Sequence, residues 1–523
     1  MTDITNLVEW CRENGGFCSD QLKLETGPSG STGYAVSDIK STSKLLSCPR
    51  NLVMDYSKAS ALWEGDQKPF ESSPVIAIRL FLSYQKVLGH NSAWAPYIRV
   101  LPDTFDTPLY FDEDDMKLLE GTNMYGEVEL RRQAWMEEWQ DAVKSLPENL
   151  DKTQFTWDLY LWASTVLTSR SFPSALVLRQ DEKESYPVLV PLVDSLNHKP
   201  LTSITWTATD EGFEISTNNN IAASKEVFNN YGPKGNEELL MGYGFCIENN
   251  EFDVVTLRLR PPPGSAELKG SGGLFRLSME DPIPNSLFMF YAEVCANAYE
   301  KQLLQNNRVS RRCELATLVA LRHSVTAKVD AIINCDQYRV ISAPTERQRF
   351  AMIYIDRQKK ILLNTAKTIA DRLEDEDLGI NVETIFKDLE FAPFTNAVSN
   401  VFLMTDANSV RDMQFEDEFL LFFLCYLSLV PNSHDGWIKI MHELYDKEVD
   451  EELALNFESL YEHSLPAFTN SHSRIFDDRF TCNLLAWASL VVDGETVDFG
   501  GRVCLVMSSY VSEPICAAQE QLL

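Results

Sequence analysis

Three polar side chains follow an apolar run in PLVDSLNHKP, residues 191–200. The apolar residues 191–193 are typical of a strand, and Asp194, Asn197 and His198 come directly after it. Amide, imidazole and backbone groups can all hydrogen-bond a ligand, so the end of this strand is a candidate binding site. A strand closed by an Asx-type turn is the alternative, and this stretch alone leaves both interpretations open.

Two tyrosines lie in NNYGPKGNEELLMGYGF, residues 229–245, and each of them is followed by glycine. Residues 237–241, between Tyr231 and Tyr243, predict a turn of helix. A sharp bend after each tyrosine would let its phenol project into a site. Two buried tyrosines in core turns are the alternative.

Two further motifs carry weaker signals. In STGYAV, residues 31–36, a glycine-bearing turn would let backbone amides approach a ligand closely. In TSRSFP, residues 168–173, Arg170 ends a helical segment, where a solvated or capping arginine is the ordinary alternative. The sequence has neither a P-loop nor a G-x-G-x-x-G that follows a strand.

The elements that must position these motifs alternate in type. Residues 4–13 predict an amphipathic helix, and residues 74–180 predict further helices with an apolar period of 3.6. ITWTAT and FEIST, on either side of residues 210–212, predict a hairpin. RPPPGSAELKGSGG, residues 260–273, predicts a linker, and residues 284–445 are helical in pattern. The expected order is β structure, a helical insertion, β structure and a helical domain.

Composition argues against several classes of function. Asp and Glu number 77 against 46 Lys and Arg, a net charge of −31, which repels nucleic acid and favours a basic protein partner. The 11 cysteines form no C-x-x-C pair, so we expect no thiolate zinc site and a reduced cytosolic or nuclear setting. No H-E-x-x-H or G-x-S-x-G motif occurs.

Neither a signal peptide nor a membrane span is expected. The N-terminal MTDITNLVEWCRENGG lacks a basic region followed by an apolar one. The most hydrophobic run, FLLFFLCYLSLV at residues 419–430, is shorter than the ~20 residues that cross a bilayer, and it predicts a buried helix.

The motifs resemble a known family when they are taken together and in order. The glycine turn, S-R-S-F, D-S-L-N-H and the two Tyr-Gly steps resemble the SET-domain protein methyltransferases. The similar branch is typified by the plant Rubisco large-subunit lysine methyltransferase and by fungal enzymes that act on ribosomal proteins, elongation factors and cytochrome c. SAWAPYIRVLPDTFDTPLYF (92–111) and RFAMIYIDRQKKIL (349–362) also resemble segments of that branch, so the likeness spans residues 1–370.

The resemblance implies an α+β protein. A SET-domain β-fold with a helical insertion is followed by a mainly α-helical C-terminal substrate-binding domain. The expected segments are the N-terminal part of the SET domain (1–73), the insertion (74–185), the C-terminal part with the cofactor and catalytic motifs (186–258), a linker (259–283), a helical substrate-binding domain (284–370) and a mostly helical extension (371–523). The resemblance assigns no function to the extension.

The resemblance also implies S-adenosyl-L-methionine as the cofactor and no metal. The residues expected to bind the cofactor are Thr32, Gly33, Tyr34, Arg170, Asn197, His198 and Tyr231. In this chain Ser31 stands where the first glycine of the family's cofactor loop lies. The residues expected to form the substrate-lysine channel are Arg170, Asp194, through its backbone carbonyl, and Tyr243. Tyr243 is the expected catalytic tyrosine, and Tyr231 shares the catalytic pocket.

The implied activity is protein-lysine N-methylation of a non-histone protein, such as a ribosomal protein or an elongation factor. Only the neutral amine is a nucleophile, and the pKa of a free lysine is ~10.4. Burial in a narrow apolar channel favours loss of the proton, and alignment of the reacting atoms supplies much of the rate.

Two alternatives remain for the activity. One family branch methylates actin histidine and has Ser in place of the Tyr of Y-G-F, so Tyr243 favours lysine. A catalytically silent SET-like interaction protein would have lost the cofactor residues, which are present. The expected partner is a protein with a target lysine on a basic surface or tail, with no nucleic acid and no membrane. We expect a monomer in the cytoplasm, with the nucleus also open.

Overall fold

The computed structural model describes residues 2–27, 30–63, 70–179, 181, 183, 185–260, 273–373, 379–430, 435–472, 479–498 and 503–506. The chain forms two compact units. The first comprises Met1–Val254 and Asp330–Lys360, and the second comprises Val255–Val329 and Ile361–Leu523. Helices and small antiparallel sheets occur together, which confirms the predicted α+β class.

Short antiparallel strands form the β part of the first unit. In the described residues these strands are β1 (Phe17–Cys18), β2 (Leu22–Gly27), β3 (Gly30–Ala35), β4 (Lys44–Pro49), β5 (Ser171–Pro173), β6 (Pro187–Leu189), β7 (Ile204–Ala208), β8 (Gly212–Thr217) and β9 (Glu226–Val227). One sheet has the order β1-β4-β8-β7, another has the order β2-β3-β9, and β5 pairs with β6. The pairing of β7 with β8 confirms the predicted hairpin.

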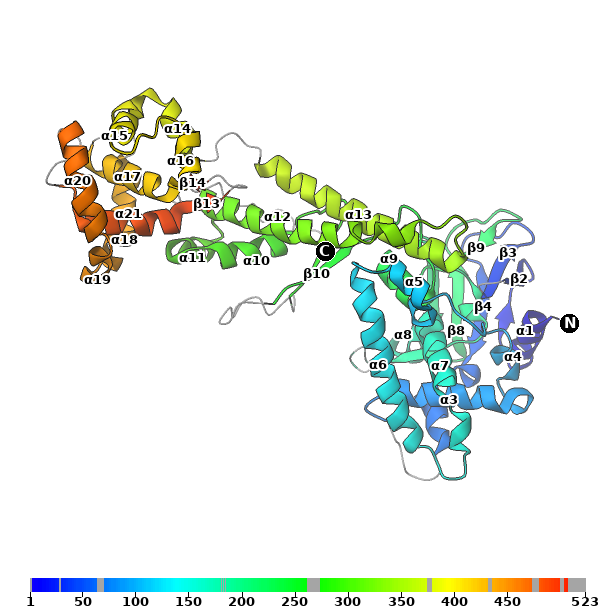
Figure 1. The fold of residues 1–523 in the computed structure, drawn as a ribbon. Coiled ribbons are helices and arrows are strands. Elements are labelled where there is room, and N and C mark those ends of the chain that lie inside the picture. The colour runs from blue at the N-terminus through cyan, green and yellow to red at the C-terminus, as the bar shows by residue number, and fades with distance from the viewer. Residues whose placement is uncertain are drawn as a thin grey trace. The chain divides into compact units, whose positions relative to one another are not determined.

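Helices surround these sheets in the first unit. They are α1 (Asp3–Glu13), α2 (Tyr56–Ala59), α3 (Pro74–Leu88), α4 (Ala95–Ile98), α5 (Glu113–Leu118), α6 (Asn123–Lys144), α7 (Trp157–Arg170), α8 (Ser174–Leu178) and α9 (Asn236–Tyr243). Helices α3, α6 and α7 pack together as the helical insertion (Figure 1). Helix α3 begins at Pro74, where the missing N–H costs nothing, and α7 begins after Thr156, whose side chain accepts a hydrogen bond from the N–H of Leu159.

The second unit begins with a strand pair and long helices. These elements are β10 (Val255–Arg258), β11 (Leu274–Leu277), α10 (Asn285–Cys295), α11 (Ala298–Leu304), α12 (Arg311–Ile333) and α13 (Glu346–Leu373). Each of the helices α12 and α13 is unbroken, but each has residues in both units, because Asp330–Lys360 is grouped with the first unit.

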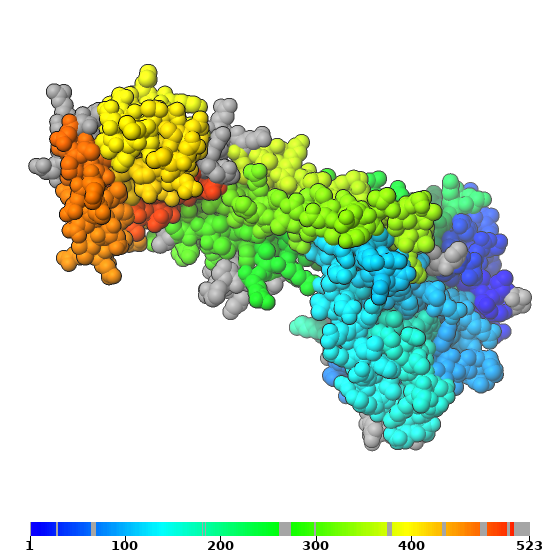
Figure 2. All heavy atoms as spheres, in the orientation of Figure 1, coloured from blue at the N-terminus to red at the C-terminus, as the bar shows by residue number. Residues whose placement is uncertain are grey.

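The extension builds a core of its own within the second unit. Its elements are β12 (Ile380–Asn381), α14 (Val382–Lys387), α15 (Ala392–Phe402), α16 (Ala407–Asp412), α17 (Glu416–Leu429), α18 (Asp435–Tyr445), α19 (Glu451–Leu455), α20 (Glu458–His472), α21 (Cys482–Glu495), β13 (Thr496–Asp498) and β14 (Val503–Leu505). Helix α17 holds the run predicted as a buried helix and is buried from Phe419 to Leu427. The side chains of α14–α17, yellow in Figure 2, form a closely packed body. No helix in the described part of the chain has both the length and the apolar content needed to cross a membrane.

The prediction of a strand at residues 191–193 is wrong. Strand β6 ends at Leu189, Leu192 has a φ of 72°, and Val193–Ser195 forms a 3-10 turn. Pro191 has no N–H for a strand ladder, and the positive φ at Leu192 turns the chain away from an extended path. Asp194 therefore lies on a tight turn two residues after the bend.

Three details differ from the expected segments. Strand β5 lies inside the expected insertion and pairs with β6 beyond its boundary. Residues 261–272 of the expected linker lie outside the described residues, and Leu274–Leu277 is the strand β11, paired with β10. Asp330–Lys360 groups with the first unit instead of with a separate helical domain. The segment boundaries remain predictions.

Candidate active site

Two cavities in the first unit share one wall. The first, named the Asn197 cavity, has a volume of about 450 Å³, and its lining includes Asn197 and Glu226. The second, named the Trp206 cavity, has a volume of about 380 Å³, and its lining includes Trp206 and Phe172. The residues that line both cavities are Ser169, Arg170, Asp194, Tyr231 and Tyr243. These five shared residues are named the junction.

Asp194 is the buried centre of the junction. Its carboxylate Oδ2 accepts a hydrogen bond of 2.7 Å from the hydroxyl of Tyr97 and lies 3.7 Å from Nη1 of Arg170. Its backbone carbonyl accepts a hydrogen bond of 3.2 Å from the same Nη1. Burial raises the pKa of Asp194, and the charge of Arg170 and the hydroxyl of Tyr97 oppose that rise.

Arg170 joins the junction to strand β3. A Cβ added to Gly30 would lie 2.5 Å from Nη2 of Arg170, so the guanidinium lies directly against this glycine. Gly30 also has a φ of 117°, a conformation that side chains disfavour. A glycine is therefore required at position 30 by both the backbone and the arginine.

Residues 31–34 of strand β3, the expected cofactor loop, each have a different environment. Ser31 lines the Asn197 cavity, while the hydroxyl of Thr32 accepts a hydrogen bond of 3.2 Å from Nδ2 of Asn197. Gly33 packs against Leu196, since a Cβ there would lie 2.6 Å from that side chain. The side chain of Tyr34 is exposed, and residues 32–34 are not among the described residues that line either cavity.

Asn197 and His198 lie together in the lining of the Asn197 cavity. The amide of Asn197 also donates to Oε1 of Glu226 at 2.9 Å, which ties the loop to strand β9. Nδ1 of His198 accepts a hydrogen bond of 3.0 Å from the backbone N–H of Tyr231. Its Nε2 is buried and has no hydrogen-bond partner among the described residues. Burial, followed by the charge of Lys234, lowers the pKa of His198 to about 4, so the imidazole is neutral at pH 7.

Three aromatic rings, two of them from the junction, form a continuous stack. The ring of Tyr231 lies 4.9 Å from the ring of His198 and 5.2 Å from the ring of Tyr243, measured between centroids. The hydroxyl of Tyr231 donates to the carbonyl of Leu196 at 2.9 Å. Burial raises the pKa of Tyr243 to about 12 and also raises the pKa of Tyr231. Both phenols are therefore neutral at pH 7 and can orient a ligand but cannot act as phenolate bases.

Helix α9 places Tyr243 at its last position. The backbone N–H of Asn236 donates to Oδ1 of buried Asp253 at 2.9 Å, and the Asn236 side chain bonds the backbone of Ile247. These bonds fix the start of the helix and the loop that follows it. Gly244 ends the helix with a φ of 80° and packs against the backbone of residues 106–107.

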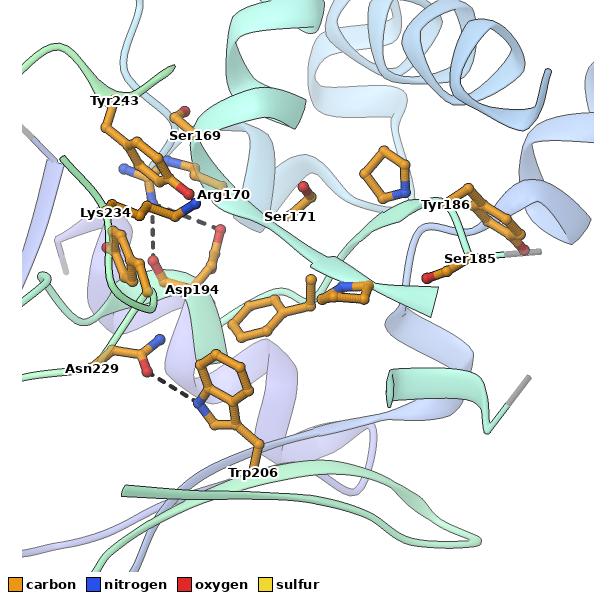
Figure 3. A pocket seen from close by; sticks show the side chains of 14 residues that line it. Ser169, Arg170, Ser171, Ser185, Tyr186, Asp194, Trp206, Asn229, Lys234 and Tyr243 are labelled. Carbon is orange, nitrogen blue, oxygen red and sulfur yellow. Dashed lines mark hydrogen bonds and ion pairs between the residues drawn. The ribbon is translucent and has the colours of Figure 1, made fainter. Parts of the chain in front are cut away.

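Aromatic and polar side chains both line the Trp206 cavity. Nε1 of Trp206 donates to Oδ1 of Asn229 at 3.1 Å, and its ring meets Phe172 edge-on with centroids 5.6 Å apart. In Figure 3 Tyr186 lies at one end of this cavity, and the other end holds Ser169, Arg170, Asp194, Lys234 and Tyr243. Nζ of Lys234 pairs with Glu238 and lies 5.7 Å from the centre of the Tyr243 ring.

Six of the predicted site residues line the cavities, namely Arg170, Asp194, Asn197, His198, Tyr231 and Tyr243, and sequence reasoning missed others. The additions that line a cavity or support the junction are Tyr97, Phe105, Ser169, Trp206, Glu226, Lys234, Phe245 and Phe350. Tyr97 and Phe105 lie in segment 92–111, and Phe350 lies in segment 349–362. Both segments resemble the family, but the resemblance assigned no role to these three residues. Glu226 and Trp206 stand in ordinary strand sequence and carried no such signal.

The described residues contain no group of three or more His, Cys, Asp or Glu side chains that could hold a metal ion. The site instead offers two cavities, neutral phenols, a neutral imidazole and backbone carbonyls at one junction. This arrangement can align two reactants held in the two cavities, which is how proximity accelerates a transfer reaction.

Comparison with known proteins identifies relatives of known activity. The chain is 30% identical over 515 residues to the ribosomal lysine N-methyltransferase set10 of Schizosaccharomyces pombe, covering 90% of this chain and 93% of that protein. It is 28% identical over 319 residues to the actin-histidine N-methyltransferase of Xenopus tropicalis, covering 56% of this chain and 54% of that protein. No family model matches.

Among solved structures, the crystal structure of the SET domain of LSMT bound to MeLysine and AdoHcy is similar. The TM-score is 0.61 at 21% sequence identity, over 75% of this chain and 97% of that chain. At this identity the likeness shows the fold alone.

Proposed function

The chain belongs to the SET-domain protein-lysine methyltransferases of the branch that includes Rubisco LSMT, and on that premise we propose how its two cavities divide the reaction and which protein it modifies. The predicted family, SET fold and S-adenosylmethionine cofactor are confirmed, and the enzyme is an S-adenosylmethionine-dependent protein-lysine N-methyltransferase of a non-histone protein. The site roles and the substrate that follow are proposals.

We propose that S-adenosylmethionine binds in the Asn197 cavity and that the target lysine enters through the Trp206 cavity. The observation that carries this division is the set of five residues, with Arg170 and Tyr243 among them, that line both cavities. Groups held in the two cavities would meet at these shared residues.

The residues of the Asn197 cavity fit the cofactor. Its volume of about 450 Å³ lies in the range of small-molecule sites, and it offers amide, hydroxyl and carboxylate groups from Asn197, Ser31 and Glu226. The buried Nε2 of His198 has no partner among the described residues, as a group awaiting a ligand would. When bound, S-adenosylmethionine supplies an electrophilic methyl group on its sulfonium.

The junction residues prepare the lysine. Burial between the aromatic rings disfavours the ammonium, so the amine enters the junction neutral. Tyr243 holds the amine by its hydroxyl, and Tyr231 stacks behind it, with its own hydroxyl fixed on the carbonyl of Leu196. Arg170 fixes the carbonyl of Asp194 at the edge of the channel. The rate comes mainly from this alignment.

We propose a ribosomal protein as the substrate, since the relative that covers 90% of this chain is a ribosomal lysine N-methyltransferase. Charge supports a basic partner. Residues 371–523 contain 29 acidic and 8 basic residues, so this extension carries −21 of the chain's net charge of −31. An acidic surface of this size attracts basic proteins and repels nucleic acid. A cytoplasmic enzyme, with the nucleus as the alternative, would meet such proteins during their synthesis and assembly.

The experiment is to incubate the purified enzyme with labelled S-adenosylmethionine and ribosomal protein from cells that lack the enzyme. We expect label in a ribosomal protein and a KM that rises with salt, because screening weakens attraction to the acidic extension. Asn197→Ala, at subsaturating S-adenosylmethionine, is the control with reduced labelling. Label confined to proteins outside the ribosomal fraction, or a KM that does not change with salt, would contradict the proposed substrate.

A further inference from the structure

We propose that Tyr97, a residue outside both cavities, is a positioning residue for methyl transfer because it fixes the Asp194–Arg170 pair at the junction. The inference rests on the proposed function, since it assumes that the transfer takes place at this junction.

Tyr97 is fully buried on the short helix α4 and has one polar partner that matters at the site. Its hydroxyl donates to Oδ2 of Asp194 at 2.7 Å. Asp194 is itself buried, with its carboxylate 3.7 Å from Nη1 of Arg170. A buried carboxylate that loses one of its partners is strongly destabilised and moves or takes up a proton.

Arg170 connects the Tyr97–Asp194 hydrogen bond to both sides of the junction. Arg170 uses the same Nη1 to hold the backbone carbonyl of Asp194 at 3.2 Å, and that carbonyl belongs to the expected lysine channel. The other amino group of Arg170 lies against Gly30 of strand β3, next to Ser31 in the Asn197 cavity. Loss of the Tyr97 hydroxyl therefore disturbs the amine side and the donor side of one junction together.

The chain contains a matched arrangement away from both cavities. The hydroxyl of buried Tyr160 donates to the carboxylate of Glu138, which pairs with Arg79. These three residues join α3, α6 and α7, and none of them is among the residues that line either cavity. Tyr160→Phe therefore removes a partly buried tyrosine–carboxylate bond without touching the junction.

The test compares Tyr97→Phe with Tyr160→Phe in the full-length enzyme. Steady-state rates are measured on the unmethylated form of the ribosomal protein that takes up label. Both variants keep the aromatic ring and lose one tyrosine–carboxylate hydrogen bond. We expect Tyr97→Phe to lower kcat by about 10- to 100-fold with KM unchanged, since small misplacements at a junction cost rates of this order. Tyr160→Phe should keep the wild-type kcat.

The outcomes separate this inference from the proposed function. A wild-type enzyme that methylates no lysine overturns both. An active wild-type enzyme with an unchanged kcat in Tyr97→Phe, or an equal loss of kcat in Tyr160→Phe, overturns the positioning role alone. If Tyr97→Phe does not fold, Asp194→Asn breaks the same chain of contacts at the carboxylate, and it must show the same loss of kcat for the inference to hold.

Discussion

Nδ1 of His198 accepts a hydrogen bond of 3.0 Å from the backbone N–H of Tyr231, and the two rings stack with centroids 4.9 Å apart. This contact joins the Asn-His loop to the first Tyr-Gly turn, which lie 33 residues apart in the chain. A protonated Nδ1 would face the same N–H as a second donor, so the neutral imidazole is the form that holds the site together.

Acid should destabilise the enzyme through His198. Its pKa is about 4 in the folded chain against 6.5 in the unfolded chain, so the unfolded state binds more protons between these values. The stability that neutral His198 contributes is full above pH 6.5 and is lost as the pH falls towards 4, on the order of 2–3 kcal/mol. Urea unfolding of wild type and of His198→Asn between pH 7 and pH 4.5 measures this contribution. The free energy of unfolding of His198→Asn should change less with pH than that of wild type.

Equal pH dependence in the two proteins would show that His198 does not carry this effect. The comparison is needed because the buried Asp194 and Asp253 have raised pKa values and therefore act in the opposite direction.

Tyr243→Phe should lower kcat by about 10- to 100-fold, because the hydroxyl that orients the amine is lost. The phenyl ring can keep its stacking on Tyr231, so cofactor affinity by calorimetry should be unchanged. Tyr125→Phe, at an exposed tyrosine, is the control. An unaltered kcat in Tyr243→Phe would remove this residue from catalysis.

Asn197→Ala should weaken the binding of S-adenosylmethionine by about tenfold, the value of a lost hydrogen-bonded contact. The amide holds Thr32 and Glu226 together at the cavity, so its loss also loosens strands β3 and β9. Calorimetric titration measures the affinity, and Asn306→Ala, at an exposed position, should bind as wild type does. Wild-type affinity in Asn197→Ala would count against its assignment to the cofactor.

Gly244→Ala should destabilise the fold and lower activity. The φ of 80° is strained for alanine, and the added Cβ would lie 3.0 Å from the backbone of residues 106–107, so we expect a cost of about 1–3 kcal/mol. Gly126 lies inside helix α6 with open space around it, so Gly126→Ala should stabilise by about 0.5–1 kcal/mol. Thermal unfolding distinguishes them, and equal melting temperatures would contradict this account of the helix end.

Sequence reasoning located the junction because its residues sit in short motifs that occur in a known order. Arg170 and Tyr243 of the junction were identified in this way, as were Asn197 and His198 of the Asn197 cavity, and all four residues line that cavity. The strand expected at residues 191–193 was wrong because a positive φ at Leu192 leaves no trace in residue type.

Residues that reach the site through long-range pairing could not be predicted. Glu226 meets Asn197 only because strand β9 lies beside β3, and Tyr97 meets Asp194 across 97 positions of sequence. The core of the extension was visible as apolar helices, but nothing in that pattern indicated which surface its acidic residues form.

The most direct test of the central claim is the chemical identity of the methylated residue. The protein that takes up label from S-adenosylmethionine is hydrolysed to amino acids, and the labelled amino acid is identified by chromatography and mass spectrometry. Two neutral phenols at the junction, with Tyr243 intact, predict methyl-lysine, with less label from the Asn197→Ala enzyme at subsaturating S-adenosylmethionine. Label in methylhistidine would contradict the account.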